Sequence, residues 1–304
     1  MKHPDDLASN LTDLADTPLA RELVENSQRL EQAGSKVVDK PLTTRIITIS
    51  NQKGGVGKTT TTVNLASALA SKGLKILVVD LDPQGNASTA LGIDHHADIK
   101  SIYEVVIDDV PIAQVVQQST ESPGVTCVPA TIHLAGAEIE LVSLVAREQR
   151  LRTAIETYLA TIPTPPDFVL IDCPPSLGLL TVNAFVAAKE VLIPIQCEYY
   201  ALEGLSQLIK SIEMIKKHLN PSLELSTILL TMYDSRTKLA SQVADEVKLH
   251  FPNQVLSTII PRSVRVSEAP SYGRTVISYD RTSPGAIAYL EAAIEMANRG
   301  AARG

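Results

Sequence analysis

Short apolar runs alternate with longer amphipathic stretches from residue 45 to the end of the chain. The stretches between the runs favour helices, most clearly at 58–73, 138–160, 202–219 and 284–298. Continuous apolar strands separated by helices are typical of a mostly parallel sheet with helices on both faces. The sequence therefore predicts a doubly wound α/β fold whose strands are RIITIS (45–50), KILVVD (75–80), VTCVPA (125–130), FVLIDC (168–173), VLIPIQ (191–196) and STILLTM (226–232).

The first 42 residues have a different character. They hold eight acidic and five basic residues, a net charge of −3, and lack the strand pattern. Such a composition favours a flexible acidic extension over residues 1–42, followed by a single domain over residues 43–304. One short amphipathic helix is also compatible with the spacing of Leu19, Leu23 and Leu30. A helix that docks on a partner is therefore the alternative interpretation of this segment.

Composition limits the classes of function. The chain has only three cysteines, which lie far apart and show no CxxC spacing. A disulfide framework or a zinc site is therefore not expected, and a reducing cytoplasm fits this pattern. We expect no secretory signal, because the N-terminal stretch lacks an apolar h-region, and no membrane span, because no uncharged apolar run reaches about 18 residues. The net charge is −7, Trp is absent and aromatic residues make up 4%. Any nucleic-acid contact would therefore be made by a local basic patch to a duplex backbone.

A glycine-rich turn joins the first strand to the first helix. The run KGGVGKT (53–59) supplies glycines that let backbone N–H groups face a phosphate at the start of a helix. Lys58 would reach the β- and γ-phosphates, and Thr59 would ligate Mg²⁺. The usual first glycine is replaced by Gln52. The nucleotide contacts predicted from this turn are Gly54, Gly55, Val56, Gly57, Lys58, Thr59 and Thr60.

The run KGGVGKTT resembles the deviant Walker A motif of the ParA/MinD group of P-loop ATPases. This resemblance implies one P-loop ATPase domain over 43–304 that binds ATP and Mg²⁺. It also implies that Lys53 reaches across a nucleotide-sandwich homodimer to the phosphates bound by the other copy. A cation supplied in this way would neutralise transition-state charge. A solvated lysine beside an anion site is the simpler alternative.

Two aspartates end the second strand, in VVDLDPQGNAS (78–88). Pro83 and Gly85 mark a turn, so Asp82 is expected in a loop that faces the γ-phosphate. Asp82 resembles the family's switch I aspartate, which orients the attacking water, and a water-mediated contact with Mg²⁺ is a further possibility. For Asp80 we expect support of the metal region or a local cap.

One aspartate ends the strand FVLID, before two prolines. Asp172 has the position of a Walker B carboxylate, which holds Mg²⁺ through water beside Thr59. Cys173 is expected to be a small buried residue, since no histidine lies near it in sequence. Lys53, Lys58 and Asp82 are the predicted catalytic residues.

The base is expected to be adenine. GTP-specific P-loop proteins carry N/T-K-x-D after a late strand, and no such run occurs here. In the family that the chain resembles, apolar and backbone contacts hold adenine. The matching segments here are LLTMYDSRT and IIPRSV, in which Met232 and Pro261 are the candidates.

Over residues 44–298 the chain resembles the small chromosomal ParA/Soj type. The resemblance implies that Arg236 and Arg265 contact double-stranded DNA without sequence preference, on a surface completed by dimerisation. Residues 258–275 hold three arginines and one glutamate, a net charge of +2. By charge alone, ordinary surface ion pairs would fit equally well. Second-rank candidates are Lys238, Arg262 and Arg274.

The resemblance implies a ParA-type ATPase for chromosome or plasmid partitioning. We expect slow ATP hydrolysis that is stimulated by a ParB-type partner, in a cytoplasmic, nucleoid-associated protein. A membrane-bound MinD type would end in a basic amphipathic helix with bulky apolar residues, and the last seven residues lack Leu, Ile, Phe and Trp. Other rivals are an electron-transfer ATPase, which needs cluster-binding cysteines, and a metabolic ligase or kinase with the same loop.

Overall fold

The protein is described here by a computed structural model that covers residues 17–199 and 201–301. Its centre is a seven-stranded sheet with the order β3-β4-β2-β5-β1-β6-β7. All neighbouring strands are parallel except β3 and β4. The predicted α/β fold is confirmed. The strands are β1 (Arg45–Ile49), β2 (Ile76–Asp80), β3 (Gln117–Gln118), β4 (Val125–Val128), β5 (Phe168–Asp172), β6 (Glu190–Gln196) and β7 (Glu224–Thr231).

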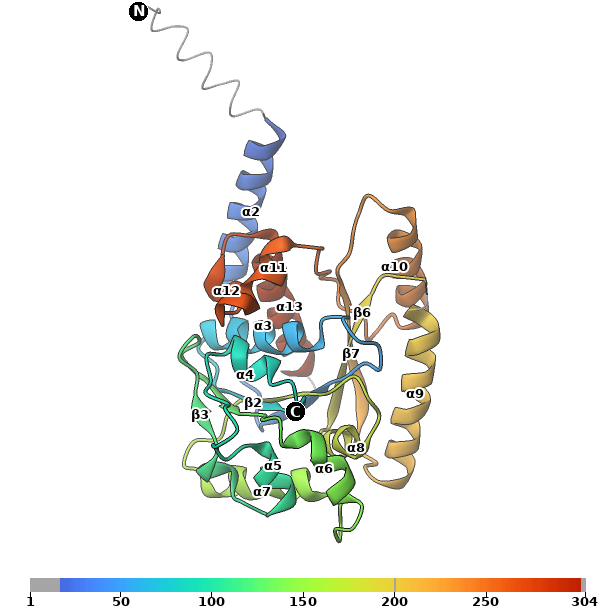
Figure 1. The fold of residues 1–304 in the computed structure, drawn as a ribbon. Coiled ribbons are helices and arrows are strands. Elements are labelled where there is room, and N and C mark those ends of the chain that lie inside the picture. The colour runs from blue at the N-terminus through green and yellow to red at the C-terminus, as the bar shows by residue number, and fades with distance from the viewer. Residues whose placement is uncertain (1–16, 200, 302–304) are drawn as a thin grey trace, which may run out of the picture.

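Helices cover both faces of the sheet (Figure 1). Alternate strand residues enter opposite cores, since successive side chains of a strand point to opposite faces: Ile47 and Val78 belong to one core, Val79 and Ile171 to the other. The first core includes α3 (Lys58–Ser71) and α13 (Pro284–Ala301). The second includes α5 (Ile102–Ile107), α6 (Leu134–Leu141), α7 (Arg150–Thr161), α8 (Leu179–Ala187), α9 (Ala201–His218) and α10 (Lys238–His250).

The prediction of one helix over 138–160 is wrong. The structure has two helices there, because α6 ends at Leu141 and α7 begins at Arg150. Ala146 in the turn between them has φ +51°, which a right-handed helix does not allow. Neither Gly nor Pro marks this break in the sequence. The remaining short elements are α4 (Asn86–Ala90), η1 (Ile112–Gln114), α11 (Val264–Glu268), η2 (Ala269–Tyr272) and α12 (Val276–Tyr279).

An amphipathic helix, α2 (Pro18–Ser35), precedes the sheet. Its inner half packs on α13, where Ala33 is buried and Arg29 pairs with Glu291 at 2.6 Å. Lys72, just after α3, donates hydrogen bonds to three main-chain carbonyls at the end of α2. The helix expected around the three leucines is therefore present. Residues 1–16 of the predicted extension lie outside the described residues.

The carboxyl ends of four parallel strands form one edge. In the pairing of β1, β2 and β5, Asp172 lies opposite both Ile49 and Asp80. The loops that follow β1, β2, β5 and β6 therefore meet along this edge, which is where ligands bind in open α/β sheets.

Candidate nucleotide site

The glycine-rich turn leaves β1 and enters α3 at Lys58. Gly55 and Gly57 have φ +74° and +90°, a region that side chains disfavour. Gly54 has ordinary φ, and a Cβ added there would meet no protein atom within 4 Å. The packing of this chain therefore does not explain Gly54, and the missing side chain leaves this backbone open to close approach by a ligand. No side chain caps the N-terminus of α3, so its first N–H groups can bind an anion.

Lys58 is held at the base of this turn. It is only 7% exposed, and its Nζ donates to the main-chain oxygen of Lys53 at 3.3 Å. Burial lowers the pKa of Lys58, an effect opposed by the attraction of Asp172. An ammonium group has three donors. The geometry therefore leaves capacity on Lys58 for a phosphate oxygen.

The predicted metal-binding pair is brought together beside Lys58. Thr59 Oγ1 donates to Asp172 Oδ2 at 2.7 Å, and Thr62 Oγ1 donates to Asp172 Oδ1 at 2.9 Å. Burial, followed by repulsion from Asp80, raises the pKa of Asp172 to about 8. Sequence reasoning missed Thr62, although its spacing of one helical turn from Lys58 places it on the same side of α3.

These oxygen groups fit Mg²⁺, which prefers hydroxyl, carboxylate and phosphate oxygens. A cation beside Asp172 would also offset the destabilising effect of burying an ionised carboxylate there. Within residues 17–199 and 201–301, no group of three or more His, Cys, Asp and Glu side chains could hold a metal ion alone. The donor set therefore suits an ion that shares its coordination with nucleotide phosphates.

Asp80 acts as a local cap. Its side chain is fully buried and accepts hydrogen bonds from the N–H of Asp82 and from both the N–H and Oγ of Ser88. Burial raises the pKa of Asp80 to about 6, and these hydrogen bonds limit the rise. Of the two roles expected for Asp80, the structure shows the cap, which fixes the turn that carries Asp82.

Asp82 lies in the loop after β2 and is partly exposed. Its Oδ1 accepts from the N–H of Gln84 at 3.0 Å, and its main-chain oxygen accepts from Gly85. Its negative charge lies near enough to Lys58 to oppose part of the lowering of that lysine's pKa by burial. The loop position expected for Asp82 is thus observed, while its role with water stays a prediction.

Lys53 lies at the outer side of the same edge. Its Nζ donates to Glu198 Oε2 at 2.5 Å, and both side chains are nearly half exposed. Glu198 follows β6 and also accepts a hydrogen bond from Gln196. Sequence reasoning missed Glu198, because no motif marks it. In a single copy, Lys53 is therefore paired with a carboxylate of its own chain.

Met232 and Pro261 line one small cavity of about 160 Å³ beside the glycine-rich turn. Met232 has φ +50°, a strained conformation for a side chain of this size. Its Cε lies 3.7 Å from the position that a Cβ on Gly57 would take. Thr231 next to it donates to the main-chain oxygen of Val56 at 2.9 Å. The cavity is therefore joined directly to the phosphate loop.

The candidate DNA-binding arginines lie on the surface in ion pairs. Arg236 pairs with Asp234 at 2.7 Å, and Arg265 pairs with Glu268 at 3.2 Å and with Asp280 at 3.5 Å. The hydrogen bond from Arg236 lowers the pKa of Asp234 to about 2.

The second-rank cations differ from one another. Arg274 pairs with Glu121 at 3.1 Å and donates to the main-chain oxygen of Ser278. Arg262 lies near Asp234, because a β-bridge joins the residues just before them, Tyr233 and Pro261. For Arg262 and Lys238, the structure shows no ion pair with any described residue.

The structure also locates the three cysteines and the apolar helices, on which rival functions would depend. All three cysteines are buried, Cys173 included as expected, and burial raises their pKa values. None of them is at the surface to clamp a shared cluster. Along the described chain, no helix is long and apolar enough to cross a membrane.

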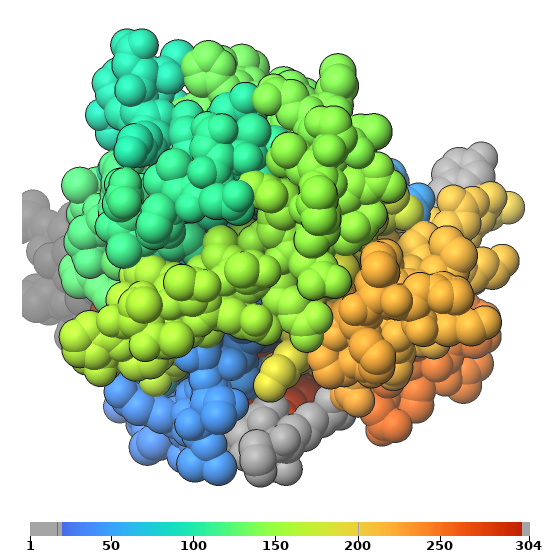
Figure 2. Space-filling model, turned by 90° about the horizontal axis from the view of Figure 1, so that it is seen from below, coloured from blue at the N-terminus to red at the C-terminus, as the bar shows by residue number. Residues whose placement is uncertain are grey.

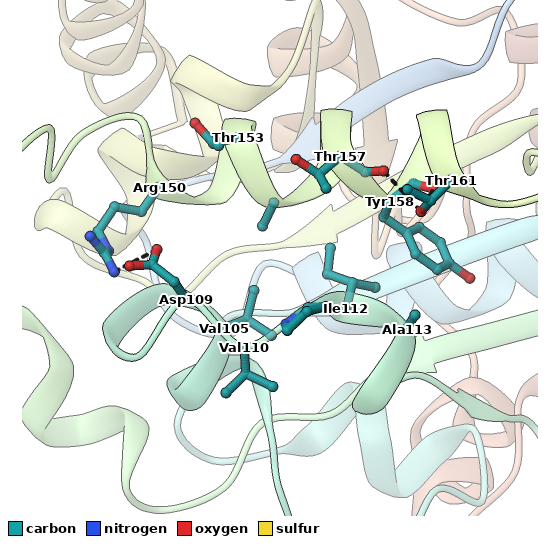
Figure 3. Close-up of a pocket in the computed structure, with 12 residues that line it drawn as sticks. Val105, Asp109, Val110, Ile112, Ala113, Arg150, Thr153, Thr157, Tyr158 and Thr161 are labelled. Carbon is teal, nitrogen blue, oxygen red and sulfur yellow. Dashed lines mark hydrogen bonds and ion pairs between the residues drawn. The ribbon is translucent and has the colours of Figure 1, made fainter.

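An apolar cavity of about 280 Å³ lies elsewhere, between η1 and α7 (Figure 3). Its charged residues, Arg150 and Asp109, pair with each other at 2.7 Å. Arg150 also donates to main-chain oxygens of α5. The cation in this lining, Arg150, is already occupied by these partners, and no glycine-rich turn faces the cavity, so the carboxyl edge of the sheet is the candidate site.

A family model described as an AAA domain matches residues 44–225, which leaves α2 outside it. The sporulation initiation inhibitor protein Soj of Bacillus subtilis is 51% identical over 257 residues, covering 84% of this chain and 99% of that protein. The chromosome partitioning protein ParA of Myxococcus xanthus is 52% identical over 255 residues, covering 84% and 88%. A solved structure of cobyrinic acid a,c-diamide synthase from Mycobacterium smegmatis, with bound ATP analog and magnesium, is 39% identical. It has a TM-score of 0.70 and covers 83% of this chain and 93% of that chain.

Proposed function

The chain belongs to the ParA/Soj family of chromosome-partitioning ATPases, and from this premise we propose that it works as a switch that ATP assembles on DNA. ATP and Mg²⁺ join two copies face to face, and the homodimer binds double-stranded DNA without sequence preference. A ParB-type partner then stimulates slow hydrolysis, which separates the copies. The observation that carries the proposal is the hydrogen bond from Thr59 to the buried Asp172 beside Lys58.

The proposed chemistry divides among residues of the edge. Backbone N–H groups of 54–60 bind the phosphates, and Lys58 balances their charge. Thr59 and, through water, Asp172 would hold Mg²⁺, which neutralises charge on the phosphate oxygens when bound. Asp82 orients the attacking water from its loop. Asp82 and the Lys53 of the other copy complete the site in the dimer, so slow turnover by a single copy follows.

Lys53 must leave Glu198 before it can serve the other copy. The pair is nearly half exposed on both sides, and exposed ion pairs contribute about 0–1 kcal/mol. Breaking it is therefore easily offset by contact with a triphosphate. Glu198 keeps the lysine ordered at the edge until the second copy arrives.

For the base, we propose adenine contacts from Met232 and Pro261. Both line the cavity beside Gly57, and neither offers the side-chain carboxylate that GTP-binding proteins use. The hydrogen bond from Thr231 to Val56 supports this assignment, because it ties the base cavity to the phosphate loop.

DNA binding is proposed for Arg236 and Arg265, supported by Arg262, Lys238 and Arg274. Phosphates of the duplex would replace the carboxylates that now pair with three of these cations. A dimer doubles the patch, so affinity should fall steeply with salt. The proposed location is the cytoplasm, on the nucleoid.

The test measures binding of an unrelated DNA duplex with ATP, ADP or no nucleotide across a salt series. Wild-type protein should bind only with ATP, and Arg236→Glu with Arg265→Glu should weaken binding at least about tenfold while leaving dimers intact. Arg152→Glu, at a half-buried site on α7, is the matched control. Equal binding with ADP would contradict the proposal. Turnover that ignores DNA and requires a small molecule would favour a metabolic ATPase.

A further inference from the structure

A histidine that no motif marks lies against the turn that carries Asp82. His95 belongs to the segment after α4, and its ring covers the residue before that helix, Gly85. Nδ1 and Cε1 of His95 lie 2.7 and 2.9 Å from the position that a Cβ on Gly85 would take. The absence of a side chain at position 85 therefore makes room for the ring. Gly85 also has φ +64°, a conformation that side chains disfavour.

The ring of His95 is also hydrogen-bonded to α4. Its Nε2 lies 2.9 Å from Thr89 Oγ1, and the same hydroxyl donates to the main-chain oxygen of Gly85 at 3.1 Å. A hydroxyl group has one proton to donate. Because Thr89 gives that proton to Gly85, Nε2 of His95 is the donor to Thr89. The histidine is therefore joined to Gly85 both by direct contact and through Thr89.

These contacts act on the turn that holds Asp82. The N–H of Gly85 donates to the main-chain oxygen of Asp82 at 2.9 Å, and no side chain caps the start of α4. On the inner side of α4, the N–H and Oγ of Ser88 donate to the buried Asp80. The turn is thus held from the inside by Asp80 and from the outside by His95.

The neighbouring histidine has a different environment. His96 pairs with Asp94 at 3.0 Å, and its side chain is 60% exposed. His95 is half-buried. Figure 2 shows the teal side chains of this part of the chain at the surface, so both histidines can be replaced without opening the core of the sheet. The two adjacent residues are therefore a matched pair, of which only His95 is tied to the turn.

We propose that His95 is a positioning residue for ATP hydrolysis, which keeps Asp82 where it orients the attacking water. The inference rests on the proposed role of Asp82 and adds the contact that holds its turn. Loss of the ring and its donor would let Gly85 and Thr89 shift, and a misplaced orienting group slows the chemical step. ATP binding should be spared, because the glycine-rich turn and Lys58 bind the phosphates from a different loop.

Steady-state kinetics test the proposal. For His95→Ala, kcat at saturating ATP and Mg²⁺ should fall about tenfold while KM stays within about twofold, as when an interaction of the transition state is lost. His95→Gln should restore kcat to within about threefold of wild type, because its amide supplies a donor in place of Nε2. The control His96→Ala should keep the wild-type kcat. Wild-type kcat in His95→Ala, or no recovery in His95→Gln, would overturn the proposal.

A double variant tests whether His95 acts through Asp82. Asp82→Ala should itself slow turnover, and adding His95→Ala should then lower kcat by less than about twofold, because the two changes affect one step. A further tenfold loss would show that His95 acts independently of Asp82, which contradicts the proposal.

Thr89 provides a second route that leaves the histidine in place. Thr89→Ser keeps the hydroxyl and should keep the rate, whereas Thr89→Val removes it and should lower kcat about as much as His95→Ala. Equal rates in these two variants would overturn the proposal even if His95→Ala failed to fold.

Failure of this inference can be told apart from failure of the proposed function. If Asp82→Ala hydrolyses ATP slowly while His95→Ala does not, the positioning role of His95 is wrong and the role of Asp82 stands. If Asp82→Ala hydrolyses ATP at the wild-type rate, the proposed role of Asp82 fails and this inference fails with it.

Discussion

The carboxyl edge of the sheet and the arginine surface carry the two halves of the proposed cycle, yet they are built differently. At the edge, Lys58, Asp80 and Asp172 are buried and held by hydrogen bonds from neighbouring elements. On the surface, Arg236 and Arg265 are exposed, and each is paired with an acid of its own chain.

The difference lies in what fixes each group. A buried charge must be paired or hydrogen-bonded, so the fold determines its position. An exposed arginine gains little from its ion pair and can exchange partners. The edge is therefore preformed for one ligand, whereas the surface is adjustable. Substitutions at the edge should abolish ATP binding. Substitutions on the surface should change DNA affinity by smaller, graded amounts.

The largest effect is expected for Lys58→Ala. The variant removes the buried cation that faces the phosphates, so ATP affinity should fall at least about a hundredfold, as when a buried, hydrogen-bonded charge loses its partner. Titration with a fluorescent ATP analogue measures the loss, and exposed Lys100→Ala is the control. If Lys58→Ala still formed ATP-dependent dimers with normal affinity, the contrast between the buried edge and the exposed arginine surface would be wrong.

A pH effect on stability should follow from Asp172. Its pKa is about 8 in the folded protein and about 3.8 when exposed, so the folded state holds the proton more tightly. Stability from this group is complete below pH 4 and is lost as pH rises towards 8, by up to about 1.4 kcal/mol per pH unit. Thermal unfolding of metal-free protein between pH 5 and 8.5 measures the slope.

Asp172→Asn is the matched control for that slope. It keeps the shape of the side chain without the titrating carboxyl, so this part of the pH dependence should disappear. ATP with Mg²⁺ should also flatten the wild-type curve, because a bound cation favours the ionised form. Identical slopes in wild type and variant would mean that Asp172 does not titrate as its burial implies.

The smallest effect is expected for Asp234→Asn. Removing this acid frees Arg236 for phosphate, so DNA affinity in the ATP state should rise about two- to fivefold, within the range of an exposed ion pair. The exposed acid Glu156, which pairs with Arg152 on α7, supplies the control Glu156→Gln. A weaker complex in Asp234→Asn would show that this ion pair positions the arginine instead of occupying it.

Much of the site was predictable because its residues are close in sequence to strand ends. The run 53–60 follows β1 and Asp172 is the last residue of β5, and parallel strands bring such ends to one edge. Thr62, Thr231 and Glu198 were missed because their partners are distant in sequence. The break between α6 and α7 was missed because Ala146 adopts a conformation usual for glycine.

The sequence by itself determined the α/β fold, the glycine-rich turn and the family, since local periodicity and short motifs encode them. Only the tertiary structure decided that Lys53 meets Glu198, that Arg265 reaches Asp280, and that α2 packs on α13. The physical reason is that ion pairs and helix packing depend on distances between residues far apart in the chain, and no local pattern of residues specifies those distances.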